Sequence, residues 1–556
     1  MDNYKLHFIP LGGVVGVTKN MYVYELYKND ALQDIIIVDC GIGFPQEKEL
    51  GVDFVIPDIS YLKDKTDKIR ALLFTHGHED HIGAASYHYE ALGKPQIYTS
   101  KLTTMFLEHK FKEAGRVPHM EVIKFGRDYT FGGFTVRFIP ITHSIPDSMH
   151  ILIKSPVGTT YHGPDFKLDL TPPYGLLPDF YEITKAGKEG VLALMSDALG
   201  ADHPGLTASE KIVGQTFEDE MRGTKGKFIM TTFSSNISRI RQCVEAAIKF
   251  NRKIVFLGRS MKENSNTAHD IGYLPIPDQF LLKEEEVMQL PPNKVCIICA
   301  GSQGQYGSAL FKLANNKNKN IKIKQGDKVL FSSDPIPGNE NEVYALIEDL
   351  TLKGADVIYS DIADQLHASG HGSQEDLKFL MRFTNPKYCV PIGGTIRHQR
   401  EYQKLAVDLG MEKNDVYMLD EGDTLWFSKN KVQTGEKVET KQIYVDAYGV
   451  GDVGSVVLRD RHTLSEEGIV VALLIIDNNG NLVSTPKILS RGFIFEQEGQ
   501  GIFEEAGQKV ESALLPRVGR LSDKSALKKE VGQIMEEFFF KARGRHPLIV
   551  VDVIQI

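Results

Sequence analysis

Short apolar runs, most of which end in Gly, Asp or His, dominate the first 207 residues. They include KLHFIPLGG, DIIIVDCG, ALLFTHGH, FTVRFIPITHS and GVLALMSDA. Runs of this length predict the β-strands of a layered α/β body, with functional residues on the loops that follow the strands.

The pattern changes near residue 208. SEKIVGQTFEDEM and ISRIRQCVEAAIKFN carry apolar residues at helical spacing. They alternate with the strand-like runs KFIMTTF, KIVFLG and KVCIICAG, which predicts a parallel sheet in a second α/β unit over residues 208–355. From residue 356 we expect DVIYSD, a helix in QEDLKFLMRFT and the strand YCVPIGG to return to the first body, which then ends at residue 427.

A polar stretch, SKNKVQTGEKVETKQ, begins at residue 428 and is typical of a linker, which we extend to residue 455. Beyond it VVALLIIDNNGNLVS predicts a strand, an NG-type turn and another strand. A helix in SALKKEVGQIMEEFFFKA and a last strand, LIVVDVIQI, complete a small α+β domain over residues 456–556. A chain of 556 residues is long enough for about three or four such domains.

The composition is that of an ordinary globular protein, with 42% hydrophobic and 25% charged residues and a net charge of −9. An acidic chain holds nucleic acid only through a local positive groove or through metal ions. No run approaches the ~20 apolar residues that span a bilayer, and the first residues lack the pattern of a signal peptide. Five scattered cysteines do not suggest a disulfide framework. We therefore expect a cytoplasmic protein that does not associate with membranes.

One segment runs against this acidic balance. The lysines of NNKNKNIKIKQGDK, from residue 315, are those of an RNA-contacting patch or of a solvated loop. The sequence leaves both interpretations open.

The strongest chemical signal is FTHGHEDHIG, residues 74–83, with four metal-ligating side chains at His76, His78, Asp80 and His81. His76 and His78 are two residues apart, so along an extended segment they project from the same side. Asp80 and His81 follow on the next turn, which offers two ligands to one metal and two to a neighbouring one. A single histidine is more often structural than a ligand, but four ligand types in six residues favour a metal. Imidazole with carboxylate and without Cys suits Zn²⁺ or Mn²⁺ in an open catalytic site.

Further ligands are needed from elsewhere in the chain. FIPITHSIPDS supplies His143 at the end of an apolar strand, and YHGPDFKLD supplies Asp165, whose two oxygens can bridge two metals. Asp39 in VDCGIGF is expected to orient a ligating histidine.

The order Asp39, His76-x-His78-x-Asp80-His81, His143, Asp165 resembles the metallo-β-lactamase fold. The segment after it is similar to the β-CASP subgroup of nucleic-acid hydrolases, and specifically to the ribonuclease J family. Stretches that support this resemblance run through the whole chain and include THGHEDHIGA, TTFSSNISRIRQ, GSQGQYGSAL, FSSDPIPGNE and HASGHGSQEDLK. The resemblance implies an αββα metallo-β-lactamase sandwich with an inserted α/β β-CASP domain and a small α+β C-terminal domain.

The resemblance also implies that the protein is a zinc-dependent ribonuclease of RNA processing and decay, with 5′→3′ exonuclease and endonuclease activity. In such an enzyme a metal-bound hydroxide hydrolyses the phosphodiester. His76, His78 and His143 would hold one zinc ion, Asp80 and His81 the other, and Asp165 would bridge them; manganese or magnesium are the alternative metals. Asp80, His371 and Asp197 would be the catalytic residues, with Asp197 orienting His371. The implied partners are 5′-monophosphorylated single-stranded RNA and further subunits in a homodimer, a homotetramer or a hetero-oligomer with a paralogue.

A set of phosphate- and RNA-binding residues is carried over from the same family. Gly and Ser in such loops let backbone N–H groups approach an oxyanion, and His adds a donor. The set consists of His367, Ala368, Ser369, Gly370, His371, Phe233, Ser234, Ser235 and Ser302.

The sequence departs from the family most at Gly393, in VPIGGTIRH, where a further histidine would complete the second metal site. Ser238 and Gln305 are lesser departures, where the family often has His and Glu. Three alternatives follow from Gly393: an active enzyme with a looser second metal, an enzyme that works with one metal or another ion, or a weakened paralogue that binds RNA or an active partner. A metallo-hydrolase of the same fold with another phosphoester substrate is a further alternative, disfavoured by the insertion and the HASGH stretch.

Overall fold

The computed structural model describes residues 3–46, 48–336, 338–363, 365–429, 431–447, 449–494, 496–515 and 523–556. The chain forms two compact units. The first comprises Met1–Gly43 and Ile56–Gln442, and the second comprises Phe44–Val55 and Ile443–Ile556.

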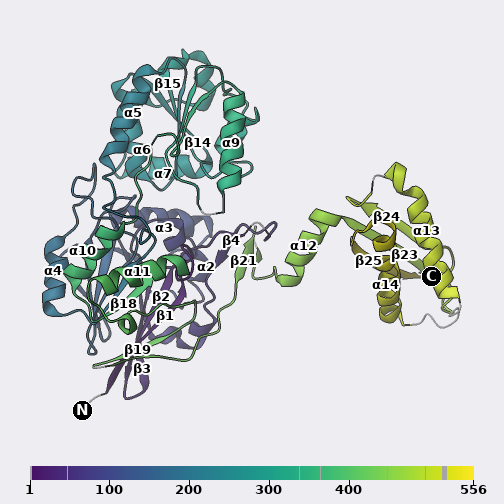
Figure 1. Ribbon diagram of the computed structural model, residues 1–556, viewed down its shortest axis with the longest axis horizontal. Coiled ribbons are helices and arrows are strands. Elements are labelled where there is room, and N and C mark those ends of the chain that lie inside the picture. The colour runs from purple at the N-terminus through teal and green to yellow at the C-terminus, as the bar shows by residue number, and fades with distance from the viewer. Residues whose placement is uncertain are drawn as a thin grey trace. The chain divides into compact units, whose positions relative to one another are not determined.

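Two mixed sheets face each other in the first unit (Figure 1). In order across the first sheet lie β20 (Lys431–Thr434), β19 (Leu425–Ser428), β1 (Tyr4–Gly12), β2 (Met21–Lys28), β3 (Ala31–Val38), β5 (Ile69–Leu73), β6 (Ile97–Thr99) and β7 (Met120–Val122). In order across the second lie β18 (Tyr388–Ile392), β12 (Ala193–Asp197), β11 (Thr159–Gly163), β10 (Met149–Lys154), β9 (Phe134–Pro140) and β8 (Asp128–Phe131). Side chains from both sheets, such as Tyr24, Ile36, Phe138 and Ile151, meet in one buried core.

Helices cover the outer faces of this sandwich. Behind the second sheet, α4 (Phe180–Glu189), α10 (Gln374–Thr384) and α11 (Ile396–Asp408) share a core with its strands. On the side of the first sheet lie α1 (Glu79–Ile82), α2 (Ala85–His88), α3 (Lys101–Glu113) and the 3₁₀ segment Ser60–Lys68. The expected αββα sandwich is therefore confirmed.

The segment between β12 and α10 forms a separate α/β sheet. Its strands, in order, are β14 (Lys253–Leu257), β15 (Val295–Cys299), β13 (Phe228–Thr231), β16 (Lys328–Phe331) and β17 (Asp356–Ile358). All neighbours are parallel, as the sequence predicts, and β13 and β15 are buried along their whole length, as parallel strands covered on both faces are. Its helices are α5 (Lys211–Gly223), α6 (Ile237–Lys249), α7 (Arg259–Asp270), α8 (Ala309–Ala314) and α9 (Glu340–Leu352).

Two local expectations are wrong. DVIYSD does not return to the first body, because β17 pairs with β16 at the edge of the inserted sheet. The stretch expected as a linker is structured in part, because Lys431–Thr434 pairs with Leu425–Ser428 and extends the first sheet by a hairpin. The other domain limits given above remain predictions.

The second unit contains a three-stranded sheet ordered β24 (Lys487–Arg491), β23 (Ile469–Ile476) and β25 (Leu548–Gln555). Its core includes side chains of α13 (Glu496–Leu514) and α14 (Lys524–Arg543), which gives the expected α+β domain. The strand expected directly after the NG turn is reduced to one bridge between Ile476 and Leu482. The remaining elements are α12 (Ser455–Glu467), β21 (Ile443–Asp446), β22 (Gly449–Val450) and β4 (Phe54–Ile56). No helix among the described residues is long and apolar enough to cross a membrane.

Candidate metal centre

The FTHGHEDHIG segment begins at the carboxyl end of β5, an interior strand of the first sheet. His76 and His78 lie on the loop, and α1 then begins, with Asp80 and His81 in its single turn. Asp39, directly after the neighbouring strand β3, accepts hydrogen bonds from the backbone N–H and the hydroxyl of Thr75. The loop is thus fixed by the strand beside it, and four potential ligands emerge at one point.

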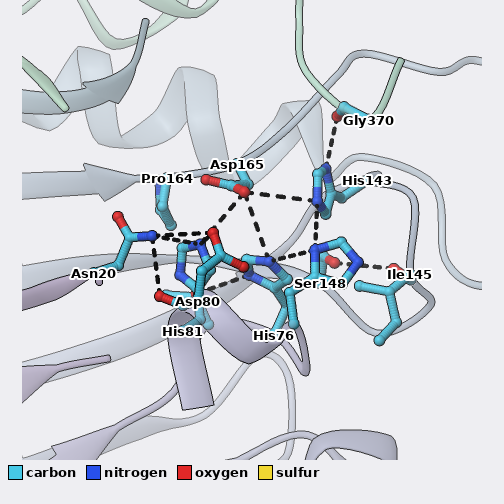
Figure 2. A network of polar contacts seen from close by, with 12 residues as sticks. Asn20, His76, Asp80, His81, His143, Ile145, Ser148, Pro164, Asp165 and Gly370 are labelled. Atoms are coloured by element: carbon cyan, nitrogen blue, oxygen red, sulfur yellow. Dashed lines mark hydrogen bonds and ion pairs between the residues drawn. The ribbon is translucent and has the colours of Figure 1, made fainter. Parts of the chain in front are cut away.

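Four candidate ligands converge, namely the imidazoles of His76, His78 and His143 and the carboxylate of Asp165. Figure 2 shows His76, His143 and Asp165 of this group. Nδ1 of His78 lies 3.1 Å from Nε2 of His76 and 3.1 Å from Nε2 of His143. Oδ2 of Asp165 lies 3.8 Å from Nε2 of His76 and 3.7 Å from Nε2 of His143. Ligand atoms around a tetrahedral zinc with bonds of about 2.0–2.1 Å are separated by roughly 3.3–3.4 Å. The spacing of this first ligand group therefore fits a zinc ion.

The protonation of the first ligand group also fits a metal. Burial lowers the pKa of His76 and of His143 well below the ordinary value and that of His78 to about 3. The three rings are therefore neutral and carry the lone pairs that a metal needs. Nδ1 of His143 donates to the carbonyl of Gly370 (2.7 Å), so that its Nε2 faces Asp165. A Cβ on Gly370 would stand 2.5 Å from Cε1 of His143, so this close approach requires glycine.

A second ligand group consists of Asp80, His81 and the same Asp165. Nε2 of His81 lies 3.3 Å from Oδ2 of Asp165 and 3.6 Å from Oδ2 of Asp80. Nδ1 of His81 lies 2.8 Å from Oδ2 of Asp39, and this contact leaves Nε2 of His81 facing the group. Burial lowers the pKa of His81, but the carboxylates of Asp165, Asp80 and Asp39 outweigh it and raise that pKa well above the ordinary value. The same negative charges favour a cation at this point.

Asn20 supports the second ligand group from outside, although the motif does not reveal it. Its amide nitrogen donates to the backbone carbonyl of Asp80 (3.1 Å) and lies 3.3 Å from Oδ2 of the same residue. The Asn20 oxygen accepts a hydrogen bond from the hydroxyl of Tyr22 (2.8 Å). Asn20 therefore fixes the position of Asp80.

Gly393, the departure noted in the sequence, lies at the second ligand group. A Cβ at this residue would meet only Oδ1 of Asp197, at 3.3 Å, and Oδ1 of Asp165, at 3.8 Å. The backbone φ of Gly393 is +67°, in the left-handed region. In the described structure no side chain from elsewhere joins Asp80, His81 and Asp165 as a fourth His, Cys, Asp or Glu ligand.

His371 and Asp197 form a pair beside the shared carboxylate. Nδ1 of His371 lies 2.7 Å from Oδ2 of Asp197, and Nε2 lies 3.8 Å from Oδ2 of Asp165. Burial lowers the pKa of His371, but the Asp197 and Asp165 carboxylates more than offset it and raise that pKa to about 9. The imidazole therefore presents a proton-bearing Nε2 toward the metal ligands.

A buried arginine holds the HASGH segment in place. Arg239, on α6 of the insertion, donates from Nε and Nη2 to the two oxygens of Glu210 at 2.8 Å each. Its Nη2 also donates to the carbonyl of Ala368 (2.9 Å), and its Nη1 to Nδ1 of His367 (2.6 Å) and to the carbonyl of Ser332 (2.7 Å). All five N–H donors of this fully buried guanidinium are thus used.

The arginine also decides which ring nitrogen of His367 carries the hydrogen. Because Nδ1 accepts from Arg239, the hydrogen of the neutral ring lies on Nε2. Burial and the guanidinium lower the pKa of His367 well below its ordinary value. His367 therefore offers a fixed N–H donor on the segment predicted to bind phosphate.

The remaining predicted phosphate residues lie at the carboxyl end of the inserted sheet. Phe233, Ser234 and Ser235 follow β13, and Ser302 follows β15. This edge is where open parallel sheets bind ligands. Ser332, which follows β16, links the edge to HASGH because its hydroxyl donates to the carbonyl of Leu366 (2.7 Å). Ser369 lies within HASGH, and its hydroxyl accepts from the backbone N–H of His371 (3.0 Å).

Sequence reasoning did not single out Arg239, Glu210, Asn20 or Thr75. Arg239 stands in a stretch that carries the family resemblance, TTFSSNISRIRQ, but nothing in its spacing shows burial. An arginine within an apolar helical pattern is the one signal that points to Arg239.

Four regions of the chain match known protein families. Residues 16–160 match the metallo-β-lactamase superfamily, and residues 225–350 match the ribonuclease J β-CASP domain. Residues 356–419 match the Zn-dependent metallo-hydrolase RNA specificity domain, and residues 456–556 match the ribonuclease J C-terminal domain.

Similar proteins span the full length of the chain. Ribonuclease J2 of Bacillus subtilis is 36% identical over 555 residues, which cover 99% of both chains. Ribonuclease J 1 of Streptococcus pyogenes is 36% identical over 98% of this chain and 96% of its own. Ribonuclease J 2 of Staphylococcus aureus is 33% identical over 100% of this chain and 99% of its own. A crystal structure of a protein of unknown function from Enterococcus faecalis shares the fold, with a TM-score of 0.54 at 14% identity over 76% of this chain and 100% of that one.

Proposed function

The chain belongs to the ribonuclease J family, and we propose that it is a metal-dependent ribonuclease that hydrolyses phosphodiester bonds of single-stranded RNA from the 5′ end and internally. One observation carries this proposal. Two groups of His and Asp ligands share the carboxylate of Asp165, and the His371–Asp197 pair lies beside that carboxylate. Such a site combines electrostatic stabilisation with a positioned proton donor.

The donor set fits two metal ions of zinc type. His76, His78, His143 and Asp165 would hold one ion, and Asp80, His81 and Asp165 the other. Two such ions, when bound, supply a nucleophile from water near neutral pH and neutralise charge on the reacting phosphate. They also offset the repulsion between a chain of net charge −9 and a polyanion. Manganese and magnesium are alternatives, because the second ligand group is rich in carboxylate.

The protein residues then have separate tasks. Asp39 and Gly370 fix the rings of His81 and His143. Asp197 holds His371 with Nε2 toward the reacting phosphate, where the ring donates a hydrogen bond or a proton. His367 to Gly370, with Ser234, Ser235 and Ser302, receive a 5′-terminal or adjacent phosphate through hydroxyl and N–H donors, and Phe233 lies beside them.

The family resemblance supports the remaining parts of the proposal. The preferred substrate is 5′-monophosphorylated single-stranded RNA, and the place of action is the cytoplasm. The protein acts as a homodimer or homotetramer, or together with a paralogue.

A weakened subunit is the second candidate function, and Gly393 is the observation that favours it. The second ligand group has three residues, and one of these is shared with the first. A protein of this kind would bind RNA or an active partner and cleave slowly.

Metal analysis together with RNA cleavage tests the proposal. We expect two zinc ions per chain, or one tight and one loose, and release of mononucleotides from the 5′ end of a 5′-monophosphorylated RNA labelled at its 3′ end. A protein that holds one ion or none and leaves this RNA and an internally structured RNA intact would support the weakened subunit. Cleavage that persists in an Asp80→Ala variant would refute the metal mechanism.

A further inference from the structure

The inserted domain carries a lysine-rich segment that the metal centre does not use. Residues 301–326 contain five lysines and no Asp, Glu or Arg, in a chain whose net charge is −9. Lys312, Lys317 and Lys319 are exposed, and none of the three forms an ion pair within the described structure. No described carboxylate therefore competes with a ligand for these three ammonium groups through an ion pair.

Two aromatic rings lie on this surface. Tyr306 is 83% exposed, and its ring centroid lies 4.9 Å from that of Phe311, with an interplanar angle of 54°. Nζ of Lys317 lies 5.1 Å from the Tyr306 centroid and 5.2 Å from the Phe311 centroid. The lysine covers the contact between the two rings, and most of Tyr306 remains open to solvent.

The loop that presents Tyr306 is held firmly. Ser308 donates its backbone N–H to the carbonyl of Gln305, and Leu310 to that of Ala300, which closes the loop on itself. The side chain of Gln303 donates to the carbonyl of Asp334 (2.9 Å) and accepts from the N–H of Ile336 (2.7 Å). An exposed aromatic ring on a fixed loop loses little entropy when a ligand stacks on it.

The same loop leads to Ser302, one of the residues predicted to bind phosphate. Ser302 is four residues from Tyr306, which is roughly 13 Å at most along the chain. Asp334, to which Gln303 is bound, lies 3.5 Å from Nε2 of His367. An RNA strand whose phosphate is bound at Ser302 and His367 can therefore reach Tyr306 with a base a few nucleotides away.

We propose that Tyr306, Phe311, Lys312, Lys317 and Lys319 form an accessory binding surface for single-stranded RNA, here called the lysine–aromatic patch. A base stacks on Tyr306, and the lysines bind the phosphates on either side. Every base offers a π-face, so such a surface binds RNA without sequence preference, and duplex RNA cannot use it because its bases are already stacked. The proposal rests on the proposed function for the identity of its ligand.

Direct binding tests the patch separately from cleavage. The full-length protein with its bound metal is titrated into a fluorescein-labelled oligouridylate of about 20 nucleotides with phosphorothioate linkages, which slow hydrolysis, and anisotropy is read at several salt concentrations. RNA integrity is checked on a gel. We expect Tyr306→Ala to weaken binding about tenfold, because stacking on one aromatic side chain contributes that much. Tyr306→Phe keeps the π-face and should stay within about twofold of the unchanged protein.

The lysines are tested by the salt dependence. Each phosphate contact contributes about 0.7 to the slope of log affinity against log salt for a single strand, so K312A/K317A/K319A should lower the slope by about 2. The matched control is K63A/K188A/K413A, which removes three exposed lysines elsewhere on the first unit and should leave the slope unchanged. A duplex of the same length should bind Tyr306→Ala and the unchanged protein equally.

Several results would overturn the proposal. They are an unchanged affinity for Tyr306→Ala, a slope lowered equally by the control lysines, or an equal loss for duplex RNA. Unchanged RNA binding in all patch variants would refute the patch as an RNA-binding surface. Failure of the proposed function is distinguishable, because absence of cleavage together with weaker binding by Tyr306→Ala refutes the ribonuclease and leaves the patch intact.

Discussion

Gly393 faces Asp165, since a Cβ at residue 393 would lie 3.8 Å from Oδ1 of the carboxylate whose other oxygen both ligand groups share. Apart from Gly393 and its two chain neighbours, the only described heavy atoms within 4 Å of that point are Oδ1 of Asp165 and Oδ1 of Asp197. Gly393 therefore leaves a gap beside the second ligand group, with room for a larger side chain.

We expect Gly393→His to fill this gap. Histidine is one of the residues that tolerate the left-handed backbone best, so the φ of +67° permits the change. The variant should bind the second metal at least about tenfold more tightly, which is the scale of effect seen for groups that merely support a ligand. Zinc content after dialysis and the rate of mononucleotide release measure it. Gly393→Ala, which adds a Cβ without a ligand atom, should raise neither, and equal gains in both variants would contradict the idea.

Loss of Asp165 should reduce metal binding more than loss of a ligand that belongs to only one of the two groups. Asp165→Ala removes the oxygen common to both groups and should abolish binding of two ions, whereas His143→Ala and Asp80→Ala should each lose one. Metal stoichiometry by mass spectrometry distinguishes the three variants. If Asp165→Ala still held two ions, the oxygen would not be shared.

His371 and Asp197 should behave as one unit. General acid groups contribute roughly 10²–10⁴-fold to a rate, so His371→Ala should lower kcat by that order. Asp197 acts through Nδ1 of His371, so D197A/H371A should be no slower than His371→Ala alone. Single-turnover rates of the two single variants and the double variant measure this. Additive losses would show that Asp197 has a separate role.

The Arg239–Glu210 ion pair should stabilise the packing of the HASGH segment against the insertion. Removing one partner of a buried ion pair costs about 3–5 kcal/mol, so Glu210→Gln and Arg239→Met should each lower the free energy of unfolding by that order. Arg239→Lys keeps the charge but cannot fill five donor positions, and it should raise KM for RNA by misplacing His367 and Ala368. Urea denaturation and steady-state kinetics measure these effects. A KM unchanged in Arg239→Lys would limit the arginine to stability.

The sequence predicts the ligands that lie close together along the chain better than the groups that hold them. His76 to His81 occupy one loop and one turn, and their spacing alone indicates a metal. His143 and Asp165 lie on the loops that follow β9 and β11 of the second sheet, where a layered α/β body places functional residues. Asp197 and His371 lie 174 residues apart and could be paired only through the family resemblance.

The supporting contacts depend on tertiary packing that no local pattern reports. Arg239 reaches Glu210 and Ala368 from a helix whose apolar spacing predicts only that it is a helix. The position of β17 has a related cause, since DVI fits a strand of either sheet and its place depends on the pairing with β16. The contact of Lys317 with Tyr306 and Phe311 likewise depends on the fold of the loop and not on the lysine spacing.

The hydrogen bond from His143 to the carbonyl of Gly370 joins two residues that are synthesised far apart in time, because 227 positions separate them. From His76 to His371 the ribosome adds 295 residues, which takes roughly 15–60 s at about 5–20 residues per second. Throughout that interval the emerging chain exposes imidazoles and carboxylates but cannot assemble His371 or the Gly370 support. The complete site can therefore assemble only after about two thirds of the 556 residues have been synthesised.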